Sequence, residues 1–83
     1  MNASLNISEI EQYVIDYIRT LRHKKGLSQE DIAHILGITS AFIGNIESSK
    51  NRAKYNLNHI NVLAEYFDLS PQEFLPKKAY PTT

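Results

Sequence analysis

Hydrophobic residues recur at helical spacing along most of this chain. Near the N-terminus they follow spacings of four, three, one and three, at Ile10, Val14, Tyr17, Ile18 and Leu21. Such a stripe is typical of a helix with one face in a protein core. Ser8 and Glu11 have the residue types and the spacing of a capping box, which starts a helix. The pattern therefore predicts a helix over 8–25.

Two shorter amphipathic segments follow, over 28–36 and 40–48. Ser28 is a good N-cap for the first, and Asp31 can complete its capping box. Gly37 can adopt the left-handed conformation that ends a helix, and Thr39 can cap the next one. The second segment is expected to bury its isoleucines against the first and to turn four residues outward, Ser40, Ala41, Gly44 and Asn45.

Beyond the polar stretch 49–57, apolar spacing predicts a fourth helix over 58–67. Ser70 and Pro71 form a strong helix start and predict a fifth helix over 71–75. No pair of strands and no internal repeat is visible. The predicted fold class is therefore all-α, a compact domain of five helices over 8–76, flanked by flexible segments at 1–7 and 77–83.

The two helices around Gly37 form a helix-turn-helix. A short helix that projects from a compact body, with small and amide side chains outward, suits the major groove of DNA. Asn45 can pair with adenine through two hydrogen bonds, Ser40 can approach several bases, and the methyl group of Ala41 can touch a thymine methyl. Gly44 is costly inside a helix, so it either allows a close approach of DNA or of a protein neighbour, or is merely tolerated.

Residues 15–75 resemble the Cro/C1-type (XRE-family) helix-turn-helix domain of phage repressors and small bacterial regulators. The residues that carry the resemblance lie at 19–33, 36–40, 43–47 and 59–75. The resemblance implies a lambda-repressor-like fold and binding to double-stranded DNA. Phe42 departs from the family, where a smaller or polar residue is common, and could contact either DNA or protein.

The resemblance also implies roles for particular residues. It makes Arg22 and Glu47 an internal ion pair with a structural role. Phosphate contacts are implied for the start of the second helix, for Thr39 and for the loop after the third, at Gln29, Thr39, Lys50, Asn51, Arg52 and Lys54. Gln29 could instead be a surface residue that favours the helix, and the charges of the loop could serve only solubility.

Charge and composition change this picture little. The 83 residues carry nine basic and nine acidic side chains, so the net charge of zero gives no general attraction to DNA. The basic residues cluster, however, on both sides of the predicted motif, at Arg19, Arg22, Lys24 and Lys25 and at Lys50, Arg52 and Lys54. A neutral total can therefore conceal a positive face.

Other functional classes find little support. The chain has no cysteine, and its three histidines lack the spacing of a metal site, so no metal or other cofactor is expected. No nucleophile motif or phosphate-binding glycine loop indicates an enzyme, and no small-molecule ligand is evident. Without a leader or a long apolar run, we expect a cytoplasmic protein that does not span a membrane.

The sequence thus predicts a bacterial transcriptional regulator, repressor-like, that binds DNA sequence-specifically without being an enzyme. One recognition helix reads few base pairs, so we expect a homodimer, formed by the last two helices and the tail with Val62 and Tyr66 as candidates. One alternative is an antitoxin or a restriction–modification controller protein. Another is a protein-interaction module that keeps the fold without binding DNA.

Overall fold

The computed structural model describes residues 7–48 and 52–81. These residues form four α-helices and one short 3-10 helix, and none of them is in a strand. In chain order the elements are α1 (Glu9–Lys24), α2 (Gln29–Leu36), α3 (Ser40–Glu47), α4 (Leu57–Tyr66) and the 3-10 helix η2 (Pro71–Phe74). The prediction of an all-α fold is confirmed.

The prediction of a fifth helix over 71–75 is confirmed only in part, since η2 is a 3-10 turn of four residues and the described residues form four α-helices. Its start is as expected: Pro71 occupies the first turn, and the Ser70 hydroxyl accepts the backbone N–H of Gln72 at 3.2 Å. The segment cannot continue because Leu75 precedes Pro76 and is extended, with φ −116° and ψ 151°. The chain is therefore forced out of the helix after one turn.

Side-chain caps set the ends of the two helices around the central turn. Ser28 and Asp31 form a capping box, in which each side chain accepts the other residue's backbone N–H, at 3.0 Å and 2.8 Å. Gly37 ends α2 with φ 71°, a conformation that most side chains disfavour. Thr39 then caps α3, its hydroxyl accepting the N–H of Phe42 at 3.2 Å.

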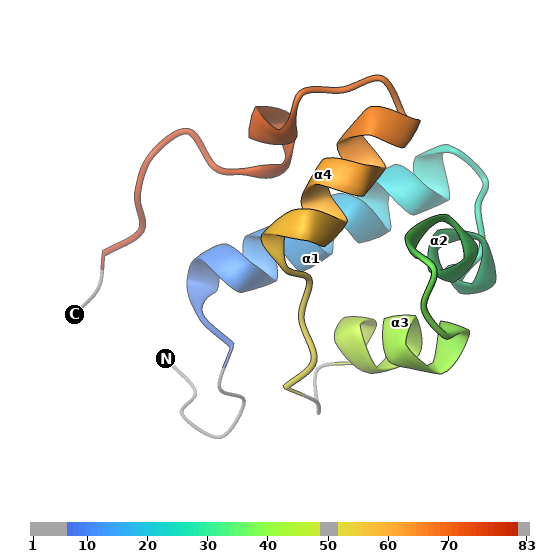
Figure 1. Cartoon of the computed structure of the whole chain (residues 1–83). Helices are drawn as coiled ribbons and strands as arrows, with labels where there is room; N and C mark the ends of the chain where they lie inside the picture. The colour runs from blue at the N-terminus through green and yellow to red at the C-terminus, as the bar shows by residue number, and fades with distance from the viewer. Residues whose placement is uncertain (1–6, 49–51, 82–83) are drawn as a thin grey trace.

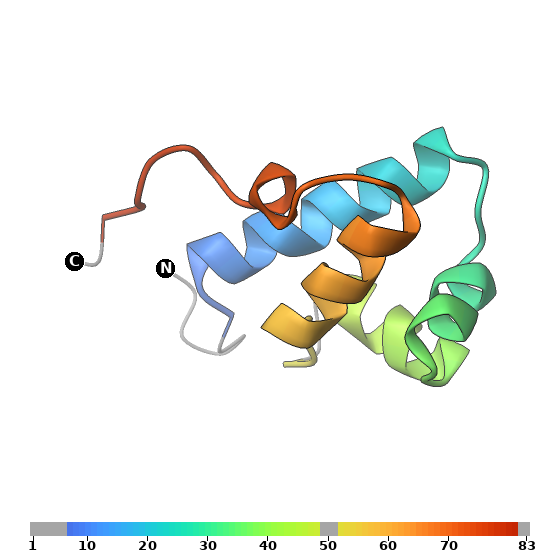
Figure 2. The same cartoon turned by 45° about the horizontal axis from the view of Figure 1, so that its top comes forward.

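One hydrophobic core joins all five elements. It contains Val14, Ile15, Ile18, Leu21, Ile32, Ala33, Ile43, Ile46, Tyr55, Ile60, Leu63, Ala64 and Phe74. Figure 1 shows α2 and α3 forming a corner at one side of the domain, and Figure 2 shows η2 lying against α1. Among the described residues, no helix is long and apolar enough to cross a membrane. This arrangement leaves α3 at one edge of the domain.

Candidate nucleic-acid interface

One side of α3 is buried and the other faces solvent. Ile43 and Ile46 point into the core, with 0% and 3% of their surface exposed. Ser40, Ala41 and Asn45 lie on the opposite side and are exposed; we call these three residues the reading face. Figure 1 shows α3 along the lower edge of the domain. The helix predicted to read DNA is therefore accessible at Ser40, Ala41 and Asn45.

A buried network fixes the C-terminal end of α3 to the rest of the domain. Two nitrogens of Arg22 donate to the carboxylate of Glu47, Nε at 3.0 Å and Nη2 at 2.8 Å. Both side chains are almost fully buried, with 9% and 5% of their surfaces exposed. Arg22 also donates to the carbonyl of Leu27 at 3.0 Å. The network therefore links α1, the loop before α2 and the last residue of α3.

The charge of Glu47 is stabilised inside this network. Burial alone would raise the pKa of Glu47, but the hydrogen bonds from Arg22 and Gln29 outweigh burial, so the pKa lies below 4.5. The guanidinium of Arg19, 3.9 Å from the same carboxylate, acts in the same direction. Glu47 is therefore an anion at neutral pH, and it holds several donors together at the end of α3.

Gln29 belongs to this network as well as to the start of α2. Its side-chain amide donates to Glu47 Oε1 at 3.0 Å. Its oxygen lies above Gly44, where a Cβ atom would be 3.4 Å away, an ordinary van der Waals distance. The neighbour that the structure shows at Gly44 is therefore a side chain of α2. Sequence analysis assigned Gln29 to phosphate and Gly44 to the bases, and neither role is tested by these contacts.

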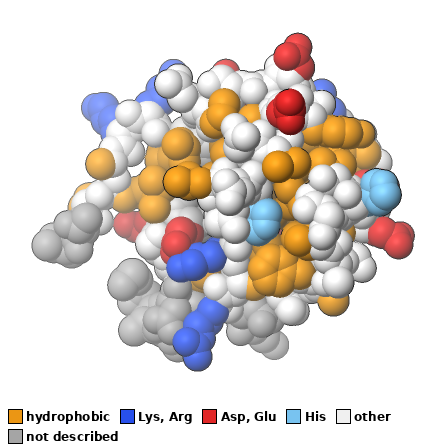
Figure 3. Space-filling view, in the orientation of Figure 1, with side chains coloured by type: hydrophobic (Ala, Val, Ile, Leu, Met, Phe, Trp, Pro, Cys, Tyr) orange, Lys and Arg blue, Asp and Glu red, His pale blue; other side chains and the backbone are white. Residues whose placement is uncertain are grey.

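The basic residues that were expected to contact phosphate lie in different surroundings. Arg52 is exposed in the segment that leads to α4. Lys54 forms an ion pair with Glu11 at 2.8 Å, so its charge is partly neutralised within the domain. Lys50 and Asn51 lie outside the described residues. Figure 3 shows lysine and arginine side chains gathered at the lower left, below the start of α4.

Comparison with known families decides the identity of this fold. Residues 16–79 match the family of helix-turn-helix domains. The chain belongs to this family. The match spans α2, α3 and the turn between them, and it agrees with the resemblance to Cro/C1-type domains. No curated protein and no solved structure matches the chain. Helix-turn-helix domains bind DNA, so membership of this family implies a DNA partner.

The open question of Phe42 has a structural answer in this helix-turn-helix domain. Phe42 is half-buried and packs against the core. Its ring meets the ring of His59 edge-on, with 6.5 Å between centroids, and His59 in turn meets Tyr55 at 5.9 Å. Phe42 therefore joins α3 to the start of α4 through an aromatic row.

The role of His59 at the start of α4 was not predicted from the sequence. The side chain of Asn56 caps α4 by accepting the N–H of His59 at 2.8 Å, and His59 Nδ1 accepts the N–H of Asn56 at 3.1 Å. Histidine thus takes the place that glutamate or glutamine usually fills in a capping box. The spacing of three residues after an asparagine was the available signal.

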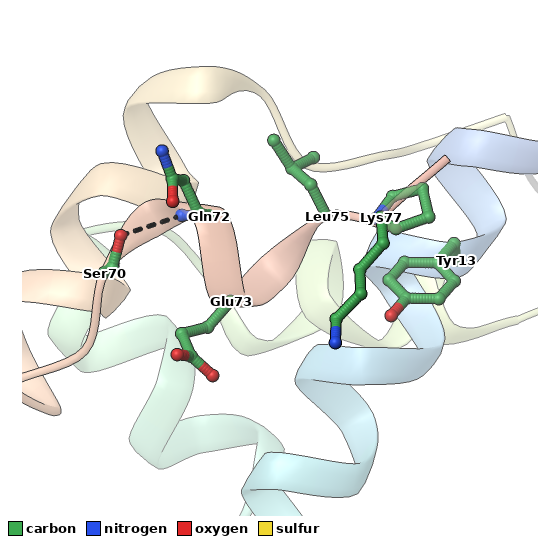
Figure 4. Close-up of a pocket in the computed structure, with 7 residues that line it drawn as sticks. Tyr13, Ser70, Gln72, Glu73, Leu75 and Lys77 are labelled. Carbon is green, nitrogen blue, oxygen red and sulfur yellow. Dashed lines mark hydrogen bonds between the residues drawn. The ribbon is translucent and has the colours of Figure 1, made fainter. Parts of the chain in front are cut away.

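The helix-turn-helix domain also has a pocket remote from α3. Figure 4 shows it between α1 and η2, lined by Tyr13, Ser70, Glu73 and Lys77 among others. The Ser70 hydroxyl is engaged in capping η2, as the dashed bond in the figure shows. Over the described ranges, no three acidic or histidine side chains gather as they would around a metal ion. The reading face thus remains the candidate site.

Proposed function

We propose that this chain binds specific double-stranded DNA sites by placing α3 in the major groove, and that it regulates transcription in the bacterial cytoplasm. The observation that carries the proposal is the reading face. It is exposed on a helix whose other side is held in the core by Ile43 and Ile46. The chain acts by binding and not by catalysis, and repression by blocking polymerase is the simplest mechanism.

The chemistry of the reading face supports recognition of bases. An asparagine amide presents one donor and one acceptor, which match N7 and the N6 amino group of adenine. The methyl group of Ala41 is suited to a thymine methyl, and the hydroxyl of Ser40 can donate or accept. The first turn of α3 carries no acidic side chain, so no carboxylate there would repel phosphate.

A homodimer would supply the specificity that one helix lacks. Two copies of α3, one helical turn of DNA apart, would read both halves of a pseudo-palindromic site. Val62 and Tyr66 on α4 support a surface for pairing, since 38% and 62% of their surfaces are exposed. Figure 3 shows hydrophobic side chains over the C-terminal half of α4 on the same face. We propose that these residues lie in the dimer interface.

The dependence of binding on salt tests the proposal. If each monomer neutralises about three to four phosphates, the logarithm of the affinity falls with log salt with a slope near −3, and twice that for a dimer. Replacing Arg52→Gln removes one exposed charge from the segment that leads to α4 and should reduce the slope by about 1. Lys78→Gln, an equal charge change on the exposed tail, is the control and should leave the slope unchanged. Absence of binding at about 50 mM salt would contradict the proposal.

A protein-interaction module is the second candidate. The ion pair of Lys54 with Glu11 favours it, because this lysine is less available to phosphate than the sequence suggests. The exposed side chains of Val62 and Tyr66 would then bind a different protein. An antitoxin would combine both activities, whereas a restriction–modification controller would need DNA binding alone. Failure to bind DNA in the salt titration would favour the interaction module.

A further inference from the structure

We propose that Gln29 is a positioning residue for α3. Its amide links the first residue of α2 to the last residue of α3, and so sets the orientation in which the reading face meets the bases. This inference rests on the proposed function, since it concerns how that face reads DNA. It gives Gln29 a task beyond the phosphate contact expected from the sequence.

The orientation of the Gln29 amide follows from its partner. A carboxylate only accepts hydrogen bonds, so the nitrogen of the amide must face Glu47, which it does at 3.0 Å. The oxygen must then point the other way, toward Gly44. Glu47 itself is held by two further hydrogen bonds from Arg22 and is almost fully buried. The anchor on which Gln29 acts is therefore rigid.

Gly44 gives the side chain of Gln29 room beside α3. A Cβ atom at Gly44 would stand 3.4 Å from the oxygen of Gln29, an ordinary van der Waals distance. The side chain of Gln29 therefore lies beside Gly44 and donates its hydrogen bond to Glu47 at the end of the helix. Together with the buried Ile43 and Ile46, this bond limits the rotation of α3 about its own axis.

Rotation of α3 matters because base contacts depend on direction. The helix has only eight residues, of which Ile43 and Ile46 are buried. A turn about its axis would move Asn45 away from a base edge, whereas contacts to phosphate tolerate such a shift better. Loss of Gln29 should therefore weaken binding to the preferred site more than binding to DNA in general.

The experiment compares two duplexes with three variants. Gln29→Ala removes the side chain, and Gln29→Met keeps its length without the amide, which guards against a folding defect. Gln12→Ala is the matched control, since the Gln12 amide donates to Asp16 at 2.9 Å on the exposed side of α1. Dissociation constants are measured for a duplex selected from a random pool and for a scrambled duplex of the same length, at one salt concentration.

Both Gln29 variants should bind the selected duplex about 10-fold more weakly and the scrambled duplex less than about 2-fold more weakly. The Gln12 variant should match the wild type on both. Equal weakening on both duplexes would assign Gln29 to phosphate alone and overturn the inference. Unchanged binding to both would overturn it as well.

A second measurement needs no DNA. Backbone amide hydrogen exchange at Ile43 and Ile46 should be faster in both Gln29 variants than in the Gln12 control, because α3 has lost a restraint. Equal exchange rates would overturn the positioning role. If the wild-type protein fails to distinguish the two duplexes, the proposed function fails, and the exchange rates then decide the role of Gln29 by themselves.

Discussion

Replacing Glu47→Ala should be among the most destabilising single changes in this domain. The carboxylate accepts three hydrogen bonds, two from Arg22 and one from Gln29. Without it, the guanidinium of Arg22, whose side chain is 9% exposed in the intact network, would keep only the Leu27 carbonyl and a contact to His23 as partners. Leaving one charge of a buried pair uncompensated costs about 3–5 kcal/mol.

That cost is large for a chain of 83 residues. Domains of this size have a free energy of unfolding of about 4–12 kcal/mol, so Glu47→Ala should unfold a large part of the population or reduce its stability severely. Urea unfolding followed by circular dichroism measures the difference. Glu65→Ala, which removes an exposed carboxylate from α4, is the matched control and should change stability by less than about 0.5 kcal/mol.

A double variant separates the buried charge from the shape of the site. Arg22→Met combined with Glu47→Leu replaces the pair by apolar groups and should recover most of the lost stability, because no charge is left buried. The reasoning fails if Glu47→Ala stays within about 1 kcal/mol of the wild type, or if the double variant is as unstable as the single one.

Three further predictions concern stability, and each is measured by urea or thermal unfolding. Burial lowers the pKa of His59 below its ordinary value of 6.5, so the folded state binds fewer protons than the unfolded state. The stability that neutral His59 contributes is therefore present above pH 6.5 and is lost as the pH falls. Replacing His59→Gln keeps an acceptor for the Asn56 N–H and should flatten this dependence between pH 7.5 and 5.5; an unchanged slope would exclude His59 as its source. Gly44→Ala should raise the free energy of unfolding by about 0.5–1 kcal/mol, because alanine is more stable than glycine inside a helix. The new Cβ atom would lie 3.4 Å from the Gln29 oxygen, an ordinary contact distance, and a loss of stability would mean that the site has no room for it. Asp68 has a φ of 57°, so Asp68→Gly should stabilise the turn after α4 by about 0.5–1 kcal/mol, and no gain would show that the aspartate is unstrained there.

The local features of this fold could be predicted from the sequence because they depend on neighbours in the chain. Ser28, Gly37 and Thr39 act within three residues of the helix ends they define, and their side-chain chemistry is specific. The outward position of Asn45 follows from the helical period and from the isoleucines beside it. The start signal at Ser70 and Pro71 located η2, but the sequence pattern did not show that the segment is a single 3-10 turn.

Contacts between elements could not be predicted in the same way. Gln29 and Glu47 are 18 residues apart, and no local pattern says that the amide turns to this carboxylate. The pairing of Lys54 with Glu11 joins the segment before α4 to the first turn of α1, so the charge near α3 was overestimated from sequence clusters. Such pairs depend on how helices pack, which the spacing of hydrophobic residues does not specify.

The most direct test of the account is the binding of an Asn45→Ala variant to a duplex selected by the wild-type protein. We expect the variant to lose about 10-fold in affinity for this duplex, since one pair of hydrogen bonds to a base is worth about 1–3 kcal/mol, and to bind scrambled DNA as the wild type does. Asn61→Ala, an exposed asparagine on α4, should bind both duplexes normally. Equal affinity of the Asn45 variant and the wild type for the selected duplex, or failure of the selection to enrich any sequence, would contradict the claim that α3 reads DNA.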